Sequence, residues 1–434
     1  MHSAIGLEQI ALVVTVALSF GLVLERFKQP VILGYIAAGI FLGPSGGLLF
    51  KALGLSGHAY VENGDAIQFC ADLGVLMVLF VVGMSLDLQS FKRAMGVSIA
   101  TMLGQLLFGL LVAFALNLFF GWGLGVSLLL AFVLALSSTA VAVKMLEVGQ
   151  EVNTDAGRVA LGILIAQDLA IVPMILVLKD LDHGIQWASL GLKIGLAMGI
   201  LTFLVWFLGR PRRVTGVLRF TSQSPELPSL LGLSFCFGFA TLSGYLGLSL
   251  AYGAFLAGLV LGNIREHTLI KQMVMPIYSV LVMVFFLSVG LLIDLSFIWH
   301  NVFVIVVLSL VIIIFKTTVN LGLLRLFRQP WPTAFLAGVA LSQLGEFSFL
   351  LISEGSKNNL LGPGAQKMLI TLTAISLAIS PLWLALARRL RAYHIRSGAS
   401  FDQTLRVYGH LVGGGLVKAY RHIFYAKPPE DGLH

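Results

Sequence analysis

Asp168 is the residue whose type and position most clearly predict chemistry in this chain. It lies in the middle of an apolar stretch, residues 157–179, directly after Gln167 and five residues before Pro173. A carboxylate at the centre of a bilayer is energetically costly and usually marks an ion or proton path. Because proline has no N–H, the carbonyl of Leu169 also loses its helical hydrogen bond. We therefore expect Asp168 to bind an ion or a proton; the alternative is a structural pair hidden inside a bundle.

The composition is that of a polytopic membrane protein. Of 434 residues, 58% are hydrophobic and 11% are charged, and apolar runs of membrane-spanning length recur from end to end. No stretch remains for a soluble enzyme domain, so we expect no enzymatic activity. The net charge of +8 comes from basic residues scattered in short loops, which argues against a nucleic-acid partner. Cys70 and Cys236 fall inside apolar runs and are interpreted as packing residues.

A window of about 20 residues predicts about thirteen transmembrane helices. Their ranges are 5–24, 31–50, 67–86, 96–120, 124–147, 157–179, 187–209, 228–246, 249–263, 273–293, 301–325, 332–353 and 366–388. The first lacks a basic n-region and is interpreted as a retained span, not a signal peptide. With the N-terminus outside, only Lys51, Lys179, Lys357 and Lys367 fall in outer loops. This asymmetry predicts a multi-pass protein of the cell (inner) membrane with a cytoplasmic C-terminus.

Three blocks of the first half recur in the same order in the second half. The matches are residues 34–43 with 253–262, 82–88 with 289–295, and 135–137 with 340–342. Matched spans are an odd number of spans apart, so the halves must cross the membrane in opposite senses, as in secondary transporters. The chain is thus predicted to be an all-α polytopic membrane protein with two inverted six-helix repeats, 5–179 and 228–390, joined by a linker helix, 187–209. Chance similarity among glycine-rich spans is the weaker alternative.

The predicted membrane domain, residues 1–396, contains two spans with polar centres. Ser137, Ser138 and Thr139 lie at the same estimated depth as Asp168, and the repeat-related span reads Ser-Gln-Leu-Gly-Glu over residues 342–346. A lone hydroxyl bonding back to its own helix would be unremarkable. Two polar centres in repeat-related spans instead favour a pair of crossing discontinuous helices, whose freed carbonyls and half-helix ends coordinate ions.

Two further charges lie at membrane depth. Lys316 is too far from either end of its span to reach water comfortably, so it needs a carboxylate or a cluster of carbonyls as a partner. An anchor for the broken helices and a role in ion exchange are equally compatible with its position. Glu346 is interpreted as a cap on the positive N-terminal end of a half-helix, with exposure in the crossing region as the alternative. Both are predicted to be supporting charges for the site.

Together these residues resemble a known family. The run Ile-Ala-Gln-Asp-Leu-Ala-Ile-Val-Pro over residues 165–173 is similar to the signature of the monovalent cation:proton antiporter-2 family, and its Gln-Asp pair resembles the Kef-type potassium efflux branch. The accompanying blocks are residues 136–139, 253–258, 289–294, Lys316 and 342–349. The resemblance covers about residues 5–390. It implies a thirteen-span homodimer with a dimerisation part and a moving core part made of spans 3 to 6 and 10 to 13.

One departure limits the resemblance. Kef-type proteins carry a cytoplasmic nucleotide-binding domain after the membrane part, whereas residues 397–434 contain no GxGxxG element and are predicted to be a short cytoplasmic tail, with the start of a longer, truncated segment as the alternative. Gating by glutathione or nucleotides is therefore not carried over, and a regulatory domain or subunit would lie outside this chain. No cofactor is expected; the bound species are membrane lipids and the transported ions.

The resemblance and the residue chemistry together predict an antiporter with alternating access of the elevator type. Asp168 is expected to bind a proton or a dehydrated cation, most simply potassium, with oxygen atoms from Ser137, Ser138, Thr139 and Gln167 completing the shell. Because Gln167 is neutral, charge counting favours electroneutral one-to-one exchange, a function in pH homeostasis. A sodium/proton antiporter of the same fold is the alternative. A cation channel or an organic-anion symporter is the alternative of another class, although a symporter would be expected to place more cationic groups than Lys316 at the site.

Overall fold

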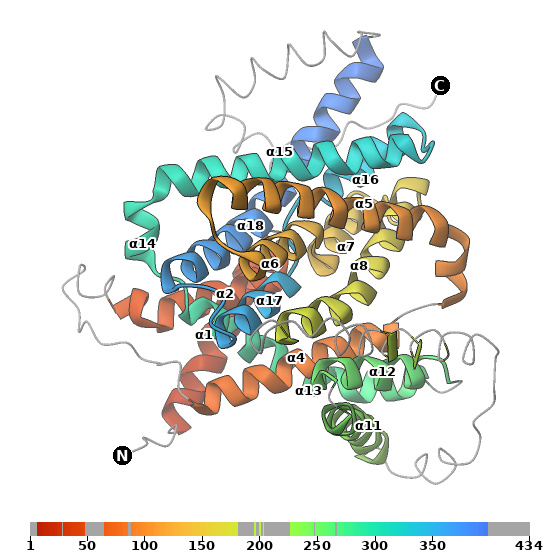
Figure 1. The fold of residues 1–434 in the computed structure, drawn as a ribbon. Helices are drawn as coiled ribbons and strands as arrows, with labels where there is room; N and C mark the ends of the chain where they lie inside the picture. The colour runs from red at the N-terminus through yellow and green to blue at the C-terminus, as the bar shows by residue number, and fades with distance from the viewer. Residues whose placement is uncertain are drawn as a thin grey trace.

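The computed structural model describes residues 7–27, 29–47, 65–85, 88–180, 226–246, 248–264 and 267–397, with a few positions between 195 and 203. All regular elements in these ranges are helices (Figure 1). They are α1 (Leu7–Arg26), α2 (Val31–Leu42), α4 (Asp65–Ser85), α5 (Leu88–Phe120), α6 (Leu124–Ala135), α7 (Thr139–Val148), α8 (Asp155–Asp180), α11 (Glu226–Tyr245), α12 (Leu250–Gly262), α13 (His267–Leu291), α14 (Leu295–His300), α15 (Val302–Leu326), α16 (Trp331–Ala340), α17 (Phe347–Lys357) and α18 (Pro363–Ser397).

The helices match the predicted membrane spans. Within the described ranges, nine segments are long and apolar enough to cross a membrane, and α2, α12 and α16 are three shorter apolar helices. A helix satisfies its own backbone polar groups, which a bilayer core cannot do, so apolar spans of this kind fold as helices. These segments account for every predicted span except 187–209. That span and the tail beyond residue 397 lie outside the described residues, apart from the few positions noted above.

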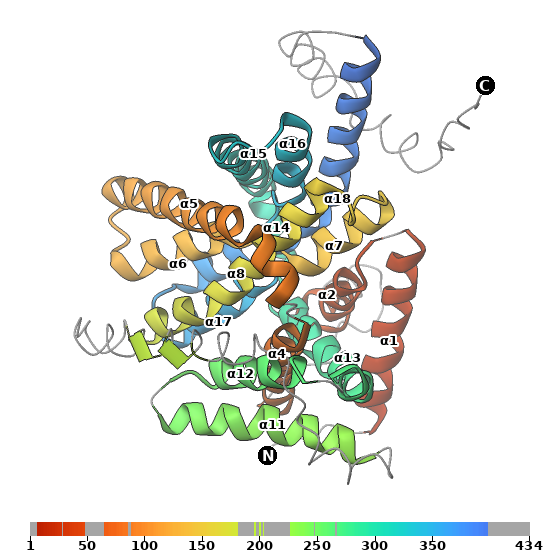
Figure 2. The same ribbon diagram turned by 90° about the vertical axis from the view of Figure 1, so that its right-hand side faces the viewer.

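The described helices form two packed groups, which Figure 2 shows one above the other. In the first, the scaffold group, α4 packs on α12 and α13, α2 packs on α1 and α13, and α11 packs on α12. In the second, the core group, α5, α6, α7, α8 and α15 to α18 pack on one another around the broken helices. The expectation that spans 3 and 10 belong to the moving part is therefore corrected, because α4 and α13 pack against the scaffold helices.

Glycine pairs explain why α4 and α13 belong to the scaffold group. A Cβ on Gly39 of α2 would lie 2.8 Å from the Cα of Gly290 in α13. At the repeat-equivalent crossing of α4 and α12, a Cβ on Gly83 would lie 3.1 Å from the carbonyl carbon of Gly258. Only residues without a side chain allow two membrane helices to approach this closely. The small-residue blocks that predicted the repeat are thus the helix contacts of this group.

The strongest helix contacts follow the inverted repeat. The pair α1 and α2 corresponds to α11 and α12, the pair α2 and α13 corresponds to α12 and α4, and the pair α5 and α6 corresponds to α15 and α16. Equivalent contacts between equivalent helices are expected only when both halves share one fold. The predicted two-repeat architecture is confirmed.

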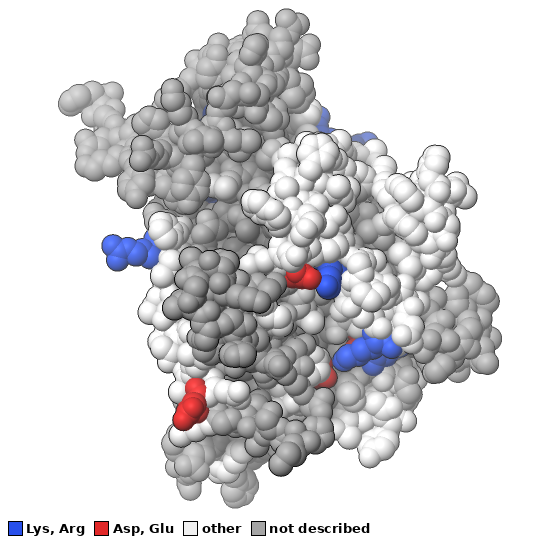
Figure 3. All heavy atoms as spheres, turned by 90° about the vertical axis from the view of Figure 1, so that its left-hand side faces the viewer, with Lys and Arg blue, Asp and Glu red and all other residues white. Residues whose placement is uncertain are grey.

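Charged side chains are sparse on the described surface. Among the described residues on the face drawn in Figure 3, most are uncharged, with a few acidic and basic groups between them. Large apolar residues such as Phe119, Trp299 and Phe303 are more than three quarters exposed. Exposed apolar side chains of this size suit contact with lipid tails instead of water. Cys70 and Cys236 are both free cysteines, and Cys236 is buried, as their interpretation as packing residues requires.

Candidate functional site

The site is built where two interrupted helices meet inside the core group. α6 ends at Ala135 and α7 begins at Thr139, while α16 ends at Ala340 and α17 begins at Phe347. The hydroxyl of Ser137 donates a hydrogen bond to the carbonyl of Leu341 at 2.8 Å, which joins the two breaks directly. The predicted pair of crossing discontinuous helices is confirmed.

Gly345 makes this close approach possible. A Cβ at this position would lie 2.9 Å from the carbonyl oxygen of Ser137, well inside a normal van der Waals contact. Glycine has no such atom, so the backbone of the second break can lie against the backbone of the first. The motif at residues 342–346 therefore supplies polar groups and also a position, Gly345, where a side chain would not fit.

Asp168 lies at the first break, where one side chain among the described residues is hydrogen-bonded to it. The hydroxyl of Thr139 donates to its carboxylate, with Oγ1 at 3.1 Å from Oδ2 and 3.3 Å from Oδ1. Asp168 is 3% exposed and lies on α8, one residue after Gln167. Thr139 is the first residue of α7, so the carboxylate faces the positive end of a half-helix. The hydroxyl and the helix end thus offset part of the cost of burying a negative charge on Asp168.

Glu346 converges on the same half-helix from the second break. Its Oε1 accepts a hydrogen bond from the backbone N–H of Ala140 at 3.4 Å. Its Oε2 is buried and has no hydrogen-bond partner within the described part of the chain. Glu346 is also the residue before α17, but its side chain makes no capping bond there. It thus caps the half-helix of the opposite repeat, α7, and brings a second carboxylate to the site.

Lys316 lies at the opposite end of the first break. Its ammonium donates a hydrogen bond to the carbonyl of Leu136, the residue that follows α6. Among the described residues, the ion pairs do not include one between Lys316 and Asp168. The positive charge therefore meets the negative end of α6, as an anchor of broken helices would.

Gln167 holds the backbone of the first break. Its Oε1 accepts from the N–H of Ser137 at 2.9 Å, and its Nε2 donates to the carbonyl of Ala135 at 3.0 Å. Ser138 is the N-cap of α7, because its hydroxyl accepts from the N–H of Val141 at 3.2 Å. The hydrogen bonds of both side chains therefore stabilise the backbone at the helix interruption. Thr139 is the predicted ligand whose hydroxyl contacts Asp168 directly.

Sequence reasoning missed two residues of this cluster, Gln105 on α5 and Asn320 on α15. The two side chains are buried and hydrogen-bonded to each other, with Gln105 Nε2 at 2.8 Å from Asn320 Oδ1. Gln105 also accepts from Gln167 at 2.7 Å. The signal that could have found them is an amide residue in the middle of an otherwise apolar span, which needs an internal partner.

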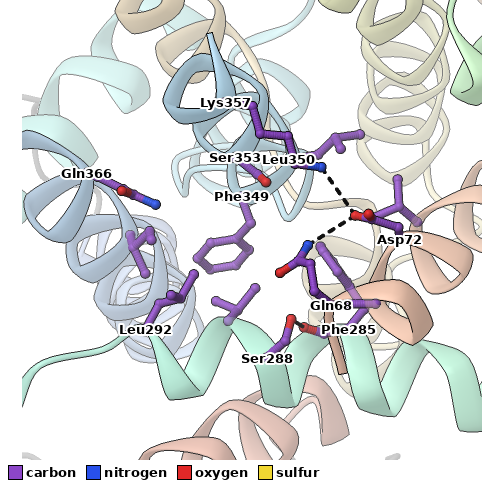
Figure 4. Close-up of a pocket in the computed structure, with 14 residues that line it drawn as sticks. Gln68, Asp72, Phe285, Ser288, Leu292, Phe349, Leu350, Ser353, Lys357 and Gln366 are labelled. Atoms are coloured by element: carbon purple, nitrogen blue, oxygen red, sulfur yellow. Dashed lines mark hydrogen bonds and ion pairs between the residues drawn. The ribbon is translucent and has the colours of Figure 1, made fainter. Parts of the chain in front are cut away.

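A small cleft lies between the two helix groups (Figure 4). It has a volume of about 40 Å³ and is lined by α4 and α13 on one side and by α17 and α18 on the other. Lys357 of α17 lies 3.4 Å from Asp72 of α4, and Gln68 donates to the same carboxylate at 3.1 Å. The rings of Phe286 and Phe349 also meet across the boundary, 6.4 Å apart. A second ion pair, Asp294 with Lys367 at 2.8 Å, also joins the end of α13 to α18.

Known proteins resemble this chain over most of its length. A family model described as sodium/hydrogen exchanger, transmembrane, matches residues 11–387. The chain is 42% identical over 402 residues to an iron transporter, MagA, of Paramagnetospirillum magneticum, covering 92% of this chain and 90% of that protein. It is 31% identical over 385 residues to K(+) efflux antiporter 5 of Arabidopsis thaliana, covering 87% and 65%.

A further relative is the glutathione-regulated potassium-efflux system protein KefC of Escherichia coli, 30% identical over 413 residues, covering 93% of this chain and 63% of that protein. The chain thus spans less than two thirds of the length of these potassium efflux relatives. Among solved structures, the sodium proton antiporter MjNhaP1 of Methanocaldococcus jannaschii has the same fold, with a TM-score of 0.64 and 15% identity, covering 88% of this chain and 97% of that one.

Proposed function

Because this chain belongs to the sodium/hydrogen exchanger family, a family of membrane antiporters, we propose that it exchanges potassium for protons at Asp168. The observation that carries this proposal is the buried carboxylate of Asp168 at the positive end of an interrupted helix, contacted only by the hydroxyl of Thr139 within the described hydrogen bonds. A proton and a dehydrated cation compete for such a group. Exchange follows because the carboxylate cannot hold both.

The donor set suits a hard monovalent cation. Carboxylate, hydroxyl and carbonyl oxygen atoms are the ligands that alkali cations prefer, and no thiolate or imidazole lies in the cluster. Potassium is favoured over sodium by the Gln-Asp pair at residues 167 and 168 and by the potassium efflux relatives. Sodium remains the alternative ion for the same site.

Alternating access is proposed to come from movement of the core group against the scaffold group. The whole ion site lies in the core group. Among the described residues, two ion pairs cross the boundary, Asp72 with Lys357 and Asp294, just after α13, with Lys367 of α18, and the ring of Phe286 meets that of Phe349. A surface ion pair contributes little stability, typically less than about 1 kcal/mol, so it can break in each cycle. The glycine-tight crossings stay inside the scaffold group, which we propose forms the homodimer interface in the cell (inner) membrane.

A second candidate cargo is a divalent cation such as ferrous iron. The observation that favours it is the second buried carboxylate, because Oε2 of Glu346 has no partner within the described residues and two carboxylates would balance two positive charges. The relative named an iron transporter points the same way. Against it, the described residues contain no group of three or more His, Cys, Asp or Glu side chains that would hold a metal.

The test is proton movement in proteoliposomes, followed with a pH-sensitive dye after pulses of potassium, rubidium, sodium, lithium or ferrous ions. We expect potassium and rubidium to release trapped protons at the lowest concentrations. A response to sodium and lithium alone would identify the sodium alternative. A response confined to ferrous ions would replace the proposal by the second candidate, and cation flux without proton movement would identify a channel.

A further inference from the structure

Three side-chain amides form a buried chain between the two helix breaks. Nε2 of Gln167 donates to Oε1 of Gln105 at 2.7 Å, and Nε2 of Gln105 donates to Oδ1 of Asn320 at 2.8 Å. Nδ2 of Asn320 then donates to the carbonyls of Leu341 at 3.0 Å and Gly338 at 3.3 Å. The three amide residues are each 5% exposed or less. The chain starts at the first break and ends at the second.

Backbone groups fix the direction of every amide in this chain. The N–H of Ser137 needs the oxygen of Gln167, so the nitrogen of Gln167 must face Gln105. The carbonyls at the other end need the nitrogen of Asn320, so its oxygen must face Gln105. Turning any one amide would set two oxygens or two N–H groups against each other. The orientation of each amide therefore depends on the next.

The hydroxyl of Ser137 closes the chain into a circuit. It donates to the carbonyl of Leu341, the group that also accepts from Asn320. One circuit of hydrogen bonds thus joins α8, α5 and α15 to both breaks. Buried polar networks of this kind rigidify a structure when every member is satisfied and are costly when one member is removed.

We propose that Gln105 and Asn320 are positioning residues for cation binding, which act through Gln167 to hold the two breaks in register. This inference rests on the proposed function and deepens it. Neither residue is hydrogen-bonded to Asp168 in the described structure, so their effect is indirect. They keep the first turn of α7 in the place where Thr139 contacts the carboxylate, and they direct the amide oxygen of Gln167 toward the N–H of Ser137.

The test compares Gln105→Leu, Asn320→Leu and the double variant with two controls. Thr101→Val changes a buried hydroxyl one turn before Gln105 on α5, and Ser309→Ala changes one on α15; neither hydroxyl has a partner within the described residues. We expect each amide variant to raise the potassium concentration for half-maximal exchange about tenfold, since partners are left unpaired, with a maximal rate within about twofold of the unmodified protein. Because both residues act through one chain, the double variant should be no worse than either single variant.

A variant with an ionisable side chain gives a pH dependence that a general loss of packing would not produce. In Gln105→Glu, the introduced group donates to Asn320 only when it is protonated; when ionised, it sets an oxygen against Oδ1 of Asn320. Potassium affinity and thermal stability should therefore approach those of the unmodified protein at acidic pH and fall as the pH rises. Gln105→Leu should lack this pH dependence relative to the unmodified protein.

Two outcomes would overturn the inference. One is an unchanged half-maximal potassium concentration in Gln105→Leu and Asn320→Leu together with lower thermal stability, which would make the chain simple structural support. The other is a Gln105→Glu variant without the acid-dependent recovery. If the unmodified protein exchanges no potassium, the proposed function fails by itself. In that case, the purified protein and each variant are heated with each cation, and the rise in the unfolding midpoint shows whether Gln105 and Asn320 affect cation binding.

Discussion

Lys316 donates its hydrogen bond to the carbonyl of Leu136 and not to Asp168. The lysine charge thus lies at the C-terminal end of α6, while Asp168 and Glu346 face the N-terminal end of α7. At the first break, each half-helix end meets a side chain of opposite sign, which is the arrangement that the helix dipole favours. The positive and negative side chains thus lie at opposite ends of the first break, and the lysine is not used to neutralise Asp168.

Replacing Lys316 is expected to destabilise the broken helix more than it weakens cation binding. In Lys316→Met the carbonyl of Leu136 loses its donor in a buried position, which costs about 1–3 kcal/mol. Thermal unfolding in detergent should show a lower midpoint, and Lys271→Met is the control because Lys271 donates to Ser85 at an exposed position. Unchanged stability together with an altered potassium dependence of exchange would instead give Lys316 a direct role in ion exchange.

Asp168→Asn is expected to fold and to lose cation-dependent proton movement, because a neutral amide cannot exchange a proton for a cation. The exchange rate in proteoliposomes should fall below about one hundredth of that of the unmodified protein, because loss of an essential proton-transferring group typically lowers a rate at least that much. Asp155→Asn is the matched control: Asp155 begins the same helix but is exposed, 3.8 Å from Arg158. Substantial exchange by Asp168→Asn vesicles would remove Asp168 from the mechanism whatever the cation.

The hydroxyls of Thr139 and Ser138 are expected to have different effects when they are removed. Thr139→Ala removes the contact with Asp168 and should raise the apparent KM for the cation with a small change in stability, while Thr139→Ser should retain the hydroxyl and the affinity. Ser138→Ala removes the N-cap of α7 and should lower the free energy of unfolding by about 1 kcal/mol. A fall in stability with unchanged KM in Thr139→Ala would show that this hydroxyl only supports the helix.

Exchange is expected to be electroneutral, with one proton for one monovalent cation at Asp168. Membrane potential should then leave the rate and the final cation gradient unchanged, because no net charge crosses. The measurement is current on a solid-supported membrane after a potassium jump. A sustained current in the unmodified protein that disappears in Glu346→Gln would show that the second carboxylate also cycles a proton.

Gln167→Asp is the informative companion to that measurement. A second acid beside Asp168 would permit charge movement by proton counting alone. The structure adds a restraint, because the nitrogen of Gln167 donates to Gln105 and to the carbonyl of Ala135, and a carboxylate cannot donate to either when ionised. We therefore expect slower exchange in Gln167→Asp, and fast charge-moving exchange would contradict the hydrogen bonding seen here.

The loop between α13 and α14 should carry a stability contribution that depends on acidity. Asp294 lies 2.8 Å from Lys367 and accepts from the N–H of Phe297, and the hydrogen bond from Lys367 is the main reason that the pKa of Asp294 is lowered. A lowered pKa means stability that is present above the ordinary value near 3.9 and is lost as the pH falls through the folded value. Asp294→Asn should be less stable than the unmodified protein at neutral pH, with the difference shrinking toward pH ~3; a constant difference would rule out this linkage.

The sequence by itself determined the membrane class, the spans, the inverted repeat and the two interrupted helices. These follow from local properties: apolar runs of fixed length, small-residue blocks that recur in order, and polar groups placed where a bilayer makes them expensive. Asp168 could be identified in the same way, because its burial is implied by the twenty or so apolar residues around it.

Only the tertiary structure decided which group each polar side chain binds. Glu346 caps α7 of the opposite repeat instead of its own helix, Gln105 and Asn320 join a chain that begins at Gln167, and α4 and α13 pack with the scaffold group. These partners are far apart in the chain and meet only through helix packing. Helical periodicity and the depth of a residue in the membrane predict that a buried polar group needs a partner, but the crossing of particular helices selects the partner.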